Sequence, residues 1–346
     1  MAPMHDKHKD SSAGPVNSGV PGNRCEVDAT VLHQRAIVGH EFEIVFHAPE
    51  IAHLARPGQF VEILFGENYA PLVRRPFSLY KVDRQAGTCS VLYVARGAFT
   101  SGMSDKKPGD IVSLLGPLGR PFRWSTDLDF QHILVAGGLG APPLYFLACE
   151  LSRSGRKHHA RAGSMHETNG GARRRAASSE PPVPRRRSAS VLNAAADLSD
   201  PEVAAHLSAS RVIVINAART ESLLVGLTEF GELDVVLHVM TDDGSKGVQG
   251  MATDLLQTLL DSEAEQPIQK AIYACGPMAM LRSVGEIAVA REIPCQISIE
   301  TSMPCGIGLC QGCAVPIWDA SSSDGFSYKL ACVDGPVFEA TELVWP

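Results

Sequence analysis

The sequence predicts three parts in order: a small antiparallel β-barrel, an α/β domain on a parallel sheet, and a short cysteine-rich C-terminal module. Residues 24–120 read as short strands separated by turns, which is typical of a small barrel. From residue 132 onward, apolar strands alternate with helical stretches, which indicates a parallel sheet with crossover helices. Four cysteines after residue 300 form a separate pattern. We therefore expect domains at residues 23–123, 130–294 and 295–346.

Size and composition agree with two domains and a smaller module. The chain has 346 residues, of which 45% are hydrophobic, so a sizeable core can form. No apolar run approaches the roughly 20 residues needed to span a bilayer, so we expect no membrane association. Residues 1–22 are polar and lack the apolar segment of a secretory signal. We expect a disordered tail there and a cytoplasmic protein.

Alternation and turn residues mark the barrel strands. Polar and apolar residues alternate over residues 41–46 and, less strictly, over residues 59–64, and residues 90–95 form another strand. The turn signals between such segments are Pro57-Gly58, Ala86-Gly87 and Pro108-Gly109. Strands at this spacing predict a small antiparallel barrel.

The α/β domain begins with a buried strand, His132–Ala136, that ends in a glycine turn, Gly137-Gly138-Leu139-Gly140. In such domains a glycine turn after the first strand receives phosphate groups at the N-terminus of the next helix. The strict G-x-G-x-x-G pattern is absent, because Pro142 stands at its sixth position, so this turn alone is a weak signal. Further strands are expected at 211–215, 235–240 and 271–275, and helices at 142–151, 251–260 and 278–291.

A basic insertion interrupts the α/β domain at residues 153–205. Between Ser152 and Ser190 the chain carries ten Lys or Arg and two acidic residues, whereas the whole chain has a net charge of −7. The segment has little hydrophobic content and no periodicity, which predicts disorder. Binding to nucleic acid or to an acidic partner is the alternative function for such a run. We expect a solvated surface loop and no nucleic-acid partner, and the role of the insertion stays open.

Four cysteines near the C-terminus carry the most specific signal of the chain. Cys305, Cys310 and Cys313 follow a C-x4-C-x2-C spacing, and Cys332 follows after a gap of 18 residues. This spacing is used by plant-type [2Fe-2S] clusters. Glycines between the ligands allow the loop to wrap tightly and leave backbone N–H groups free to point at sulfur. The three glycines are Gly306, Gly308 and Gly312.

Structural zinc and unligated buried thiols are the alternatives for this pattern. Zinc sites usually take paired C-x2-C knuckles, and only one such pair is present. A disulfide framework suits a small secreted chain rather than one of this size without a secretory signal. The remaining cysteines stand singly and are expected to be buried side chains: Cys25, Cys89, Cys149, Cys275 and Cys295.

Five segments together resemble one protein family. They are Leu72-Val-Arg-Arg-Pro-Phe-Ser78, Leu114-Leu-Gly-Pro-Leu-Gly119, Val135-Ala-Gly-Gly-Leu-Gly-Ala-Pro-Pro-Leu144, Tyr273-Ala-Cys-Gly-Pro-Met278, and the cysteine loop with Lys329-Leu-Ala-Cys-Val-Asp-Gly-Pro-Val-Phe338. From about residue 24 to residue 343, apart from the insertion, the chain resembles the electron-transfer subunits of NAD-linked (type B) dihydroorotate dehydrogenases. These subunits belong to the ferredoxin-reductase superfamily. The resemblance implies an FAD-binding barrel, a Rossmann-like NAD domain and a [2Fe-2S] module.

The resemblance also implies flavin-binding residues in the barrel. Arg75 would bind the FAD pyrophosphate, to which a guanidinium offers a rigid fork of donors. Ser78 would lie near flavin N5, the atom that exchanges hydride. Thr100 would contact phosphate, although Phe99 stands before it where the family usually has glycine, which puts close backbone approach at 99 in doubt. The other residues implied at the flavin are Pro76, Phe77, Leu92, Tyr93 and Val94.

For NAD, the resemblance implies two loops of the α/β domain. Gly138 and Gly140 would cradle phosphate, and Cys275, Gly276 and Pro277 would border the nicotinamide. The choice of NAD over NADP is inferred from the family alone. Thr241-Asp-Asp-Gly-Ser245 resembles a further loop of the nucleotide site.

The expected activity is electron transfer, with no catalytic residue of its own. NAD exchanges two electrons, a [2Fe-2S] cluster exchanges one, and FAD can do both, so FAD is expected between them. The resemblance implies a separate FMN-containing dihydroorotate dehydrogenase catalytic subunit as partner, in a heterotetramer of two plus two, within pyrimidine biosynthesis. The electron-transfer subunit of an NADH-dependent ferredoxin:NADP oxidoreductase or of a sulfide dehydrogenase is a close alternative. A cluster-based redox-sensing regulator is a more distant one.

Overall fold

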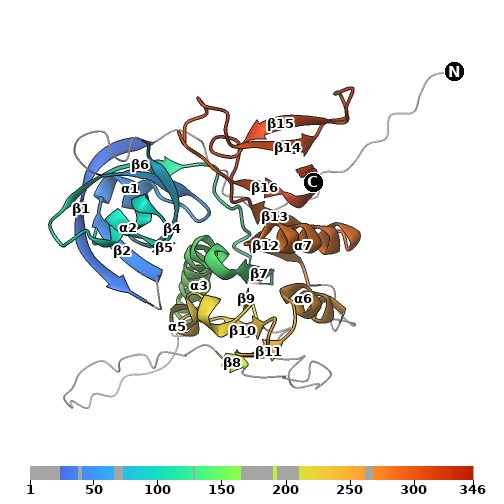
Figure 1. Cartoon of the computed structure of the whole chain (residues 1–346). Coiled ribbons are helices and arrows are strands. Elements are labelled where there is room, and N and C mark those ends of the chain that lie inside the picture. The colour runs from blue at the N-terminus through green and yellow to red at the C-terminus, as the bar shows by residue number, and fades with distance from the viewer. Residues whose placement is uncertain are drawn as a thin grey trace, which may run out of the picture.

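The structure is a computed structural model that describes residues 24–37, 41–65, 73–127, 129–164, 190–192, 210–261 and 268–345. Figure 1 shows a barrel on one side and an α/β domain on the other, with the C-terminal segment above the α/β domain. The predicted tail at 1–22 lies outside the described residues, as do residues 165–189 and 193–205 of the predicted insertion.

The N-terminal domain is a closed antiparallel barrel in the strand order β1-β2-β5-β4-β3-β6, which confirms the predicted architecture. Its interior is filled by apolar side chains from every strand, for example Val31, Phe46 and Val91, none of which is exposed to solvent. The strands are β1 (Cys25–Ala36), β2 (Glu41–His47), β3 (Phe60–Leu64), β4 (Arg75–Asp83), β5 (Thr88–Val94) and β6 (Ile111–Leu118), with short helices α1 (Pro49–Leu54) and α2 (Ala98–Ser104).

The second domain is built on a parallel sheet with the order β11-β10-β9-β7-β12-β13-β16, in which β16 alone runs antiparallel. β7 lies between β9 and β12, so the sheet reverses its direction of winding there. In such sheets ligands bind beyond the carboxyl ends of the strands at this point. The strands are β7 (Gln131–Gly137), β9 (Val212–Ala218), β10 (Val236–Thr241), β11 (Val248–Gln249), β12 (Lys270–Cys275), β13 (Cys295–Ser298) and β16 (Val337–Glu339), with β8 (Ser190–Leu192) beside β10.

Helices cover both faces of this sheet (Figure 1). On one face Leu144 and Leu147 of α3 share a core with Val214 of β9, and on the other Leu256 and Leu281 pack with the opposite side of the sheet. Among the described helices, none is long and apolar enough to cross a membrane. The helices are η1 (Gly138–Gly140), α3 (Ala141–Ser164), η2 (Glu221–Leu223), α5 (Leu227–Gly231), α6 (Ala252–Asp261) and α7 (Met278–Ala290).

Helix α3 is longer than the sequence predicts. It continues past Leu151, the predicted end, to Ser164, so the first residues assigned to the insertion are helical. The reason is that residues 152–159 are polar or small and offer no apolar spacing from which to predict a helix.

The C-terminal segment returns to the sheet. After β13 the chain forms the cysteine loop, then the hairpin of β14 (Ala314–Trp318) and β15 (Phe326–Leu330), and reaches β16 and the short helix η3 (Ala340–Glu342). Cys313 and Cys332 belong to the same apolar core as residues of α6 and α7. The cysteine module is therefore continuous with the α/β core.

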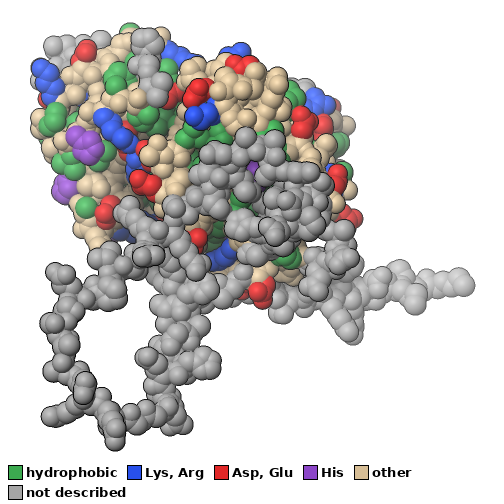
Figure 2. All heavy atoms as spheres, turned by 90° about the horizontal axis from the view of Figure 1, so that it is seen from below, with side chains coloured by type: hydrophobic (Ala, Val, Ile, Leu, Met, Phe, Trp, Pro, Cys, Tyr) green, Lys and Arg blue, Asp and Glu red, His purple; other side chains and the backbone are tan. Residues whose placement is uncertain are grey.

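Charged side chains are distributed over the surface rather than gathered by sign on the face that Figure 2 shows. On that face, basic and acidic side chains lie interspersed among apolar and neutral ones.

Candidate functional site

A cavity of about 300 Å³ lies where the barrel meets the carboxyl ends of the parallel strands. The barrel contributes residues from β4 and β5, and the α/β domain contributes Leu139 and Pro142 after β7. Six residues predicted to bind flavin line this one cavity: Pro76, Phe77, Ser78, Leu92, Tyr93 and Val94. The structure therefore brings together segments that the sequence predicts to share one ligand.

Arg75 is the better placed of two adjacent arginines to reach a ligand. The Arg74 guanidinium is held by the barrel, because it donates to the carbonyl of Ser113 at 3.2 Å and to the Ser113 hydroxyl at 3.0 Å and pairs with Glu26. Arg75 is exposed, and among the contacts found for its guanidinium are backbone carbonyls and the Phe99 ring, whose centroid lies 5.7 Å away. An exposed guanidinium of this kind is available to phosphate.

Phe99 and Thr100 have structural roles in the described chain. The Phe99 ring is nearly buried in the barrel core and stacks with Phe77 at a centroid distance of 6.1 Å, so it lies beneath the cavity lining. The Thr100 hydroxyl accepts hydrogen bonds from the N–H groups of Arg96 and Gly97 at 2.9 and 3.1 Å, which caps the start of α2. Whether Thr100 contacts phosphate stays a prediction.

The two glycine-containing turns of the α/β domain pack directly against each other. Gly138 has φ of +52°, and a Cβ there would have nothing nearer than 4.0 Å, so its surroundings are open. A Cβ at Gly140 would lie 2.1 Å from the carbonyl oxygen of Cys275, and one at Gly276 would lie 2.9 Å from the Cα of Gly137. Gly140 and Gly276 are thus required by close backbone approach, whereas Gly138 leaves room for a ligand.

Glu300 is a candidate site residue that the sequence analysis missed. It follows β13, lines the cavity, and accepts a hydrogen bond from the Cys275 thiol, with Sγ and Oε1 3.8 Å apart. Its side chain is exposed through the cavity, yet the protein around the carboxyl desolvates it, which raises the pKa of Glu300 above its usual value. Burial and the nearby carboxyl raise the pKa of Cys275 well above its usual value, so the thiol stays protonated.

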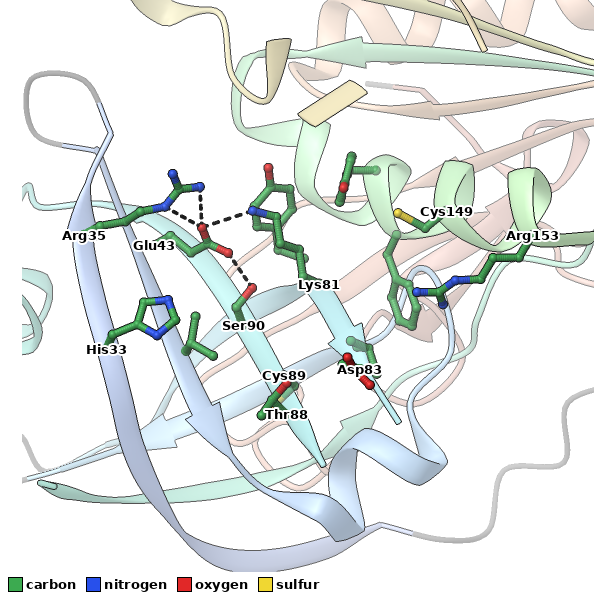
Figure 3. A pocket seen from close by; sticks show the side chains of 15 residues that line it. His33, Arg35, Glu43, Lys81, Asp83, Thr88, Cys89, Ser90, Cys149 and Arg153 are labelled. Carbon is green, nitrogen blue, oxygen red and sulfur yellow. Dashed lines mark hydrogen bonds and ion pairs between the residues drawn. The ribbon is translucent and has the colours of Figure 1, made fainter. Parts of the chain in front are cut away.

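A second, larger cavity of about 590 Å³ lies elsewhere, between the outer wall of the barrel and α3. None of the predicted site residues lines it. Figure 3 shows the buried Glu43 carboxylate at its centre, which accepts hydrogen bonds from Arg35 at 2.8 Å, Lys81 at 3.2 Å and Ser90 at 3.0 Å. Arg35 and Lys81 also pair with Glu229 of α5, so this ion cluster fastens the barrel to the α/β domain.

The four predicted ligand cysteines form two pairs. The Sγ atoms of Cys313 and Cys332 lie 3.3 Å apart, and the backbone N–H of Cys310 donates to Cys305 Sγ at 3.4 Å. Across the described part of the chain, no three His, Cys, Asp or Glu side chains surround a position for a single metal ion. Two pairs match a two-iron cluster, in which each iron takes two protein ligands.

Backbone donors around these sulfurs also fit a cluster. The N–H of Gly312 points at Cys310 Sγ at 3.5 Å, and the N–H of Cys332 points at Cys313 Sγ at 3.5 Å. Desolvation raises the pKa of Cys305, but hydrogen bonds from the loop outweigh it and lower that pKa to about 6. Such donors stabilise thiolates, which are the form that binds iron.

Known proteins match the chain at three levels. Residues 300–344 match the iron-sulfur cluster binding domain of dihydroorotate dehydrogenase B. The chain is 32% identical over 316 residues to the dihydroorotate dehydrogenase B (NAD(+)) electron transfer subunit of Geobacillus kaustophilus, covering 91% of this chain and 97% of the relative. It is 30% identical over 319 residues to the same subunit of Desulforamulus reducens, covering 92% and 98%.

Solved structures show the same fold. The structure of an NADH-dependent reduced ferredoxin-NADP oxidoreductase, described for flavin-based electron bifurcation, matches with a TM-score of 0.64 and 25% identity, covering 94% of this chain and 92% of the other. An Amycolatopsis cytochrome P450 reductase matches with a TM-score of 0.50 and 18% identity, covering 78% and 66%. The second likeness concerns the fold alone.

Proposed function

This chain belongs to the family of dihydroorotate dehydrogenase B electron transfer subunits, and on that premise we propose that it carries electrons between a catalytic subunit and NAD. The cofactors are FAD and a [2Fe-2S] cluster, with NAD as co-substrate. When bound, they supply electron transfer in single steps at the cluster and in pairs at the nicotinamide, with a flavin able to do both. The chain is an oxidoreductase subunit.

One observation carries this proposal more than any other: the cysteine loop rests on the strand beside the flavin segment. A Cβ at Gly306 would lie 2.6 Å from Cγ of Glu62 on β3 and 2.8 Å from Leu118 on β6. Glu62 is paired with Pro76 of β4, next to Arg75. The cysteine loop and the flavin-binding segment therefore both lie against β3. Such proximity is what an electron path between a cluster and a flavin requires.

The chain's own residues would hold and orient the cofactors. Arg75 would bind the pyrophosphate of FAD, and Ser78 with Leu92–Val94 would line the flavin ring. Gly138, which has open space around it, would admit the NAD phosphates, while Gly140 keeps the Cys275 turn in place. Glu300 would hold the Cys275 thiol toward the cavity that both cofactors share.

Cys305, Cys310, Cys313 and Cys332 would ligate the cluster. The pairing of Cys313 with Cys332 and of Cys305 with Cys310 supports this assignment, because it supplies two thiolates to each iron. All nine cysteines are free, and we place the protein in the reducing cytoplasm, where thiolate ligands persist.

The term electron transfer subunit implies a partner catalytic subunit. We propose that this partner contains FMN, oxidises dihydroorotate in pyrimidine biosynthesis, and joins the present chain in a heterotetramer of two plus two. The electrons finally reduce NAD to NADH.

Anaerobic reconstitution tests the cofactor assignment. The purified full chain should show flavin absorbance together with two irons and two sulfides per chain, and NADH should bleach both chromophores. A chain that binds neither flavin nor iron under these conditions would disprove the proposal.

A second function, that of the electron-transfer subunit of an NADH-dependent ferredoxin:NADP oxidoreductase, is favoured by the solved structure at 25% identity. Isolation of the chain with its native partner separates the two, because that partner would be a glutamate-synthase-like flavoprotein rather than an FMN barrel.

A further inference from the structure

The hairpin of β14 and β15 presents an unusual outer face. Residues directly opposite each other on paired strands share one face, and so do residues two apart. One face of this hairpin therefore consists of Ala314, Pro316 and Trp318 opposite Leu330, Tyr328 and Phe326. All six are apolar or aromatic, and Trp318 and Tyr328 are each 65% exposed. We call this set the hairpin face.

The opposite face of the hairpin is already covered. Val315 and Ile317 are buried in the main core, and Lys329 pairs with Glu342 at 3.0 Å. An antiparallel sheet packed on one side normally places polar residues on the other. Here the covered face is anchored by Val315 and Ile317, and the outward face is apolar as well, so the hairpin face lacks the composition of a surface that meets water.

The hairpin face continues onto the cysteine loop. A Cβ at Gly308 would lie 2.9 Å from Val333 and 3.7 Å from Leu330 of the hairpin face. The next residue, Leu309, is 77% exposed, the most exposed large hydrophobic side chain in the described part of the chain. Cys310, a proposed cluster ligand, follows it and is itself exposed.

One edge of the hairpin is also open. The outer edge of β14 is held by the C-terminal residues, since Ile317 pairs with Leu343 and the N–H of Val344 donates to the carbonyl of Pro316 at 3.1 Å. Among the described strands, β15 pairs with β14 alone. An apolar strand with a free edge promotes association with another chain unless it is covered.

We propose that the hairpin face and Leu309 form the docking surface for the catalytic subunit, an inference that rests on the proposed function. The occupant follows from continuity with the cysteine loop. A redox partner has to approach the cluster, and a protein that covers this face also covers Leu309 and Cys310. Exposed Trp and Tyr are the side chains that most often dominate binding energy at such surfaces.

Charge around the face specifies the partner further. Asp319 and Asp324 stand in the turn of the hairpin, where Asp324 is exposed and Asp319 is partly exposed. The matching surface should therefore be apolar at its centre, with Lys or Arg at the rim that meets this turn, and its flavin should lie behind the part that faces Leu309.

Binding between reconstituted full-length chain and the FMN-containing catalytic subunit tests the proposal. The double variant Trp318→Ser/Tyr328→Ser should bind more weakly and raise the dissociation constant by about 100-fold or more, because two central aromatic anchors are lost. The matched control, Met251→Ser/Val289→Ser, removes two exposed hydrophobic side chains from the α6 and α7 region and should bind as the unaltered chain does. Flavin content, iron content and NADH oxidation with a small artificial acceptor should be the same in all three proteins.

Three results would overturn the docking surface. If the unaltered chain binds the catalytic subunit and the Trp318/Tyr328 variant binds equally well, the surface lies elsewhere while the proposed function stands. If the variant instead converts a dimer of the chain alone into a monomer, the face belongs to a second copy. Failure of the unaltered chain to bind, with both cofactors present, would contradict the proposed partner and the docking surface together.

Discussion

The Cys275 thiol lies 3.8 Å from Oε1 of Glu300, and this contact joins the turn after β12 to the segment after β13. Both residues sit at the carboxyl ends of neighbouring parallel strands, where the barrel closes the cavity. The carboxyl holds a protonated thiol at the position where the resemblance places the nicotinamide. We therefore propose Glu300 as a positioning residue for the exchange between NADH and flavin.

Replacing Glu300 tests that role. Glu300→Ala should lower kcat for NADH oxidation with an artificial acceptor by about 10-fold or more, since a 1.4 kcal/mol change in the barrier is tenfold. Glu300→Gln keeps an acceptor oxygen and should recover most of the rate. The exposed Glu286, which pairs only with Arg282 among the ion pairs found, supplies the control Glu286→Ala. Equal rates for Glu300→Ala and that control would exclude a role for the carboxyl.

Gly140 should be essential for packing rather than for ligand contact. In Gly140→Ala, the new methyl group would overlap the Cys275 carbonyl, so the turn must shift, at a cost of about 1–3 kcal/mol in unfolding free energy. KM for NADH should rise as well. Gly231→Ala, where a Cβ meets nothing within 4 Å, is the control and should change neither quantity. Calorimetry and steady-state kinetics give the two readouts.

Gly306 should control cluster content separately from flavin content. Gly306→Ala places a Cβ against Glu62 and Leu118 and should lift the cysteine loop off the barrel, so iron and sulfide fall while FAD stays bound. Gly109→Ala has a similar positive φ, +95° against +65°, but meets nothing within 4 Å. Gly109→Ala is therefore the control that measures the effect of backbone strain alone. Equal iron content in the two variants would show that contact with the barrel does not matter.

Stability should depend on pH through His132, which is buried in β7. Desolvation, aided by Arg211, lowers the pKa of His132 to about 3. Because the folded-state pKa is lowered, the contribution of neutral His132 to the free energy of unfolding is complete above the unfolded pKa of about 6.5. That contribution is lost as pH falls toward 3, by about 3–5 kcal/mol in total. In urea titrations between about pH 5 and pH 6.5, the free energy of unfolding should change less with pH in His132→Phe than in the unaltered chain. Parallel slopes for both proteins would contradict the assignment.

The fold was largely predictable because its signals are local. Alternation and turn residues predicted the barrel, and apolar runs such as 132–136 predicted the parallel strands. The full length of α3 was not predictable, since the residues after Leu151 lack apolar spacing. The strand β16 was also missed, because its three residues pair with β13 only through the path of the whole C-terminal segment.

Part of the candidate site is carried by short sequence segments, and their convergence was predictable. Residues 76–78 and 92–94 converge on one cavity as the resemblance implies. Glu300 has no motif of its own, and its role depends on how closely β12 and β13 place their ends. The reason for glycine at 140 likewise lies in the distant Cys275 carbonyl rather than in the residues beside it.

Dihydroorotate-dependent NAD reduction tests the central claim most directly. The reconstituted chain is mixed anaerobically with the FMN-containing catalytic subunit, dihydroorotate and NAD, and NADH formation is followed by absorbance. We predict steady NADH formation that requires both subunits and that falls at least about 100-fold in Cys310→Ser, because that substitution removes a cluster ligand. Absence of NADH formation with both subunits fully loaded with cofactor would contradict the account.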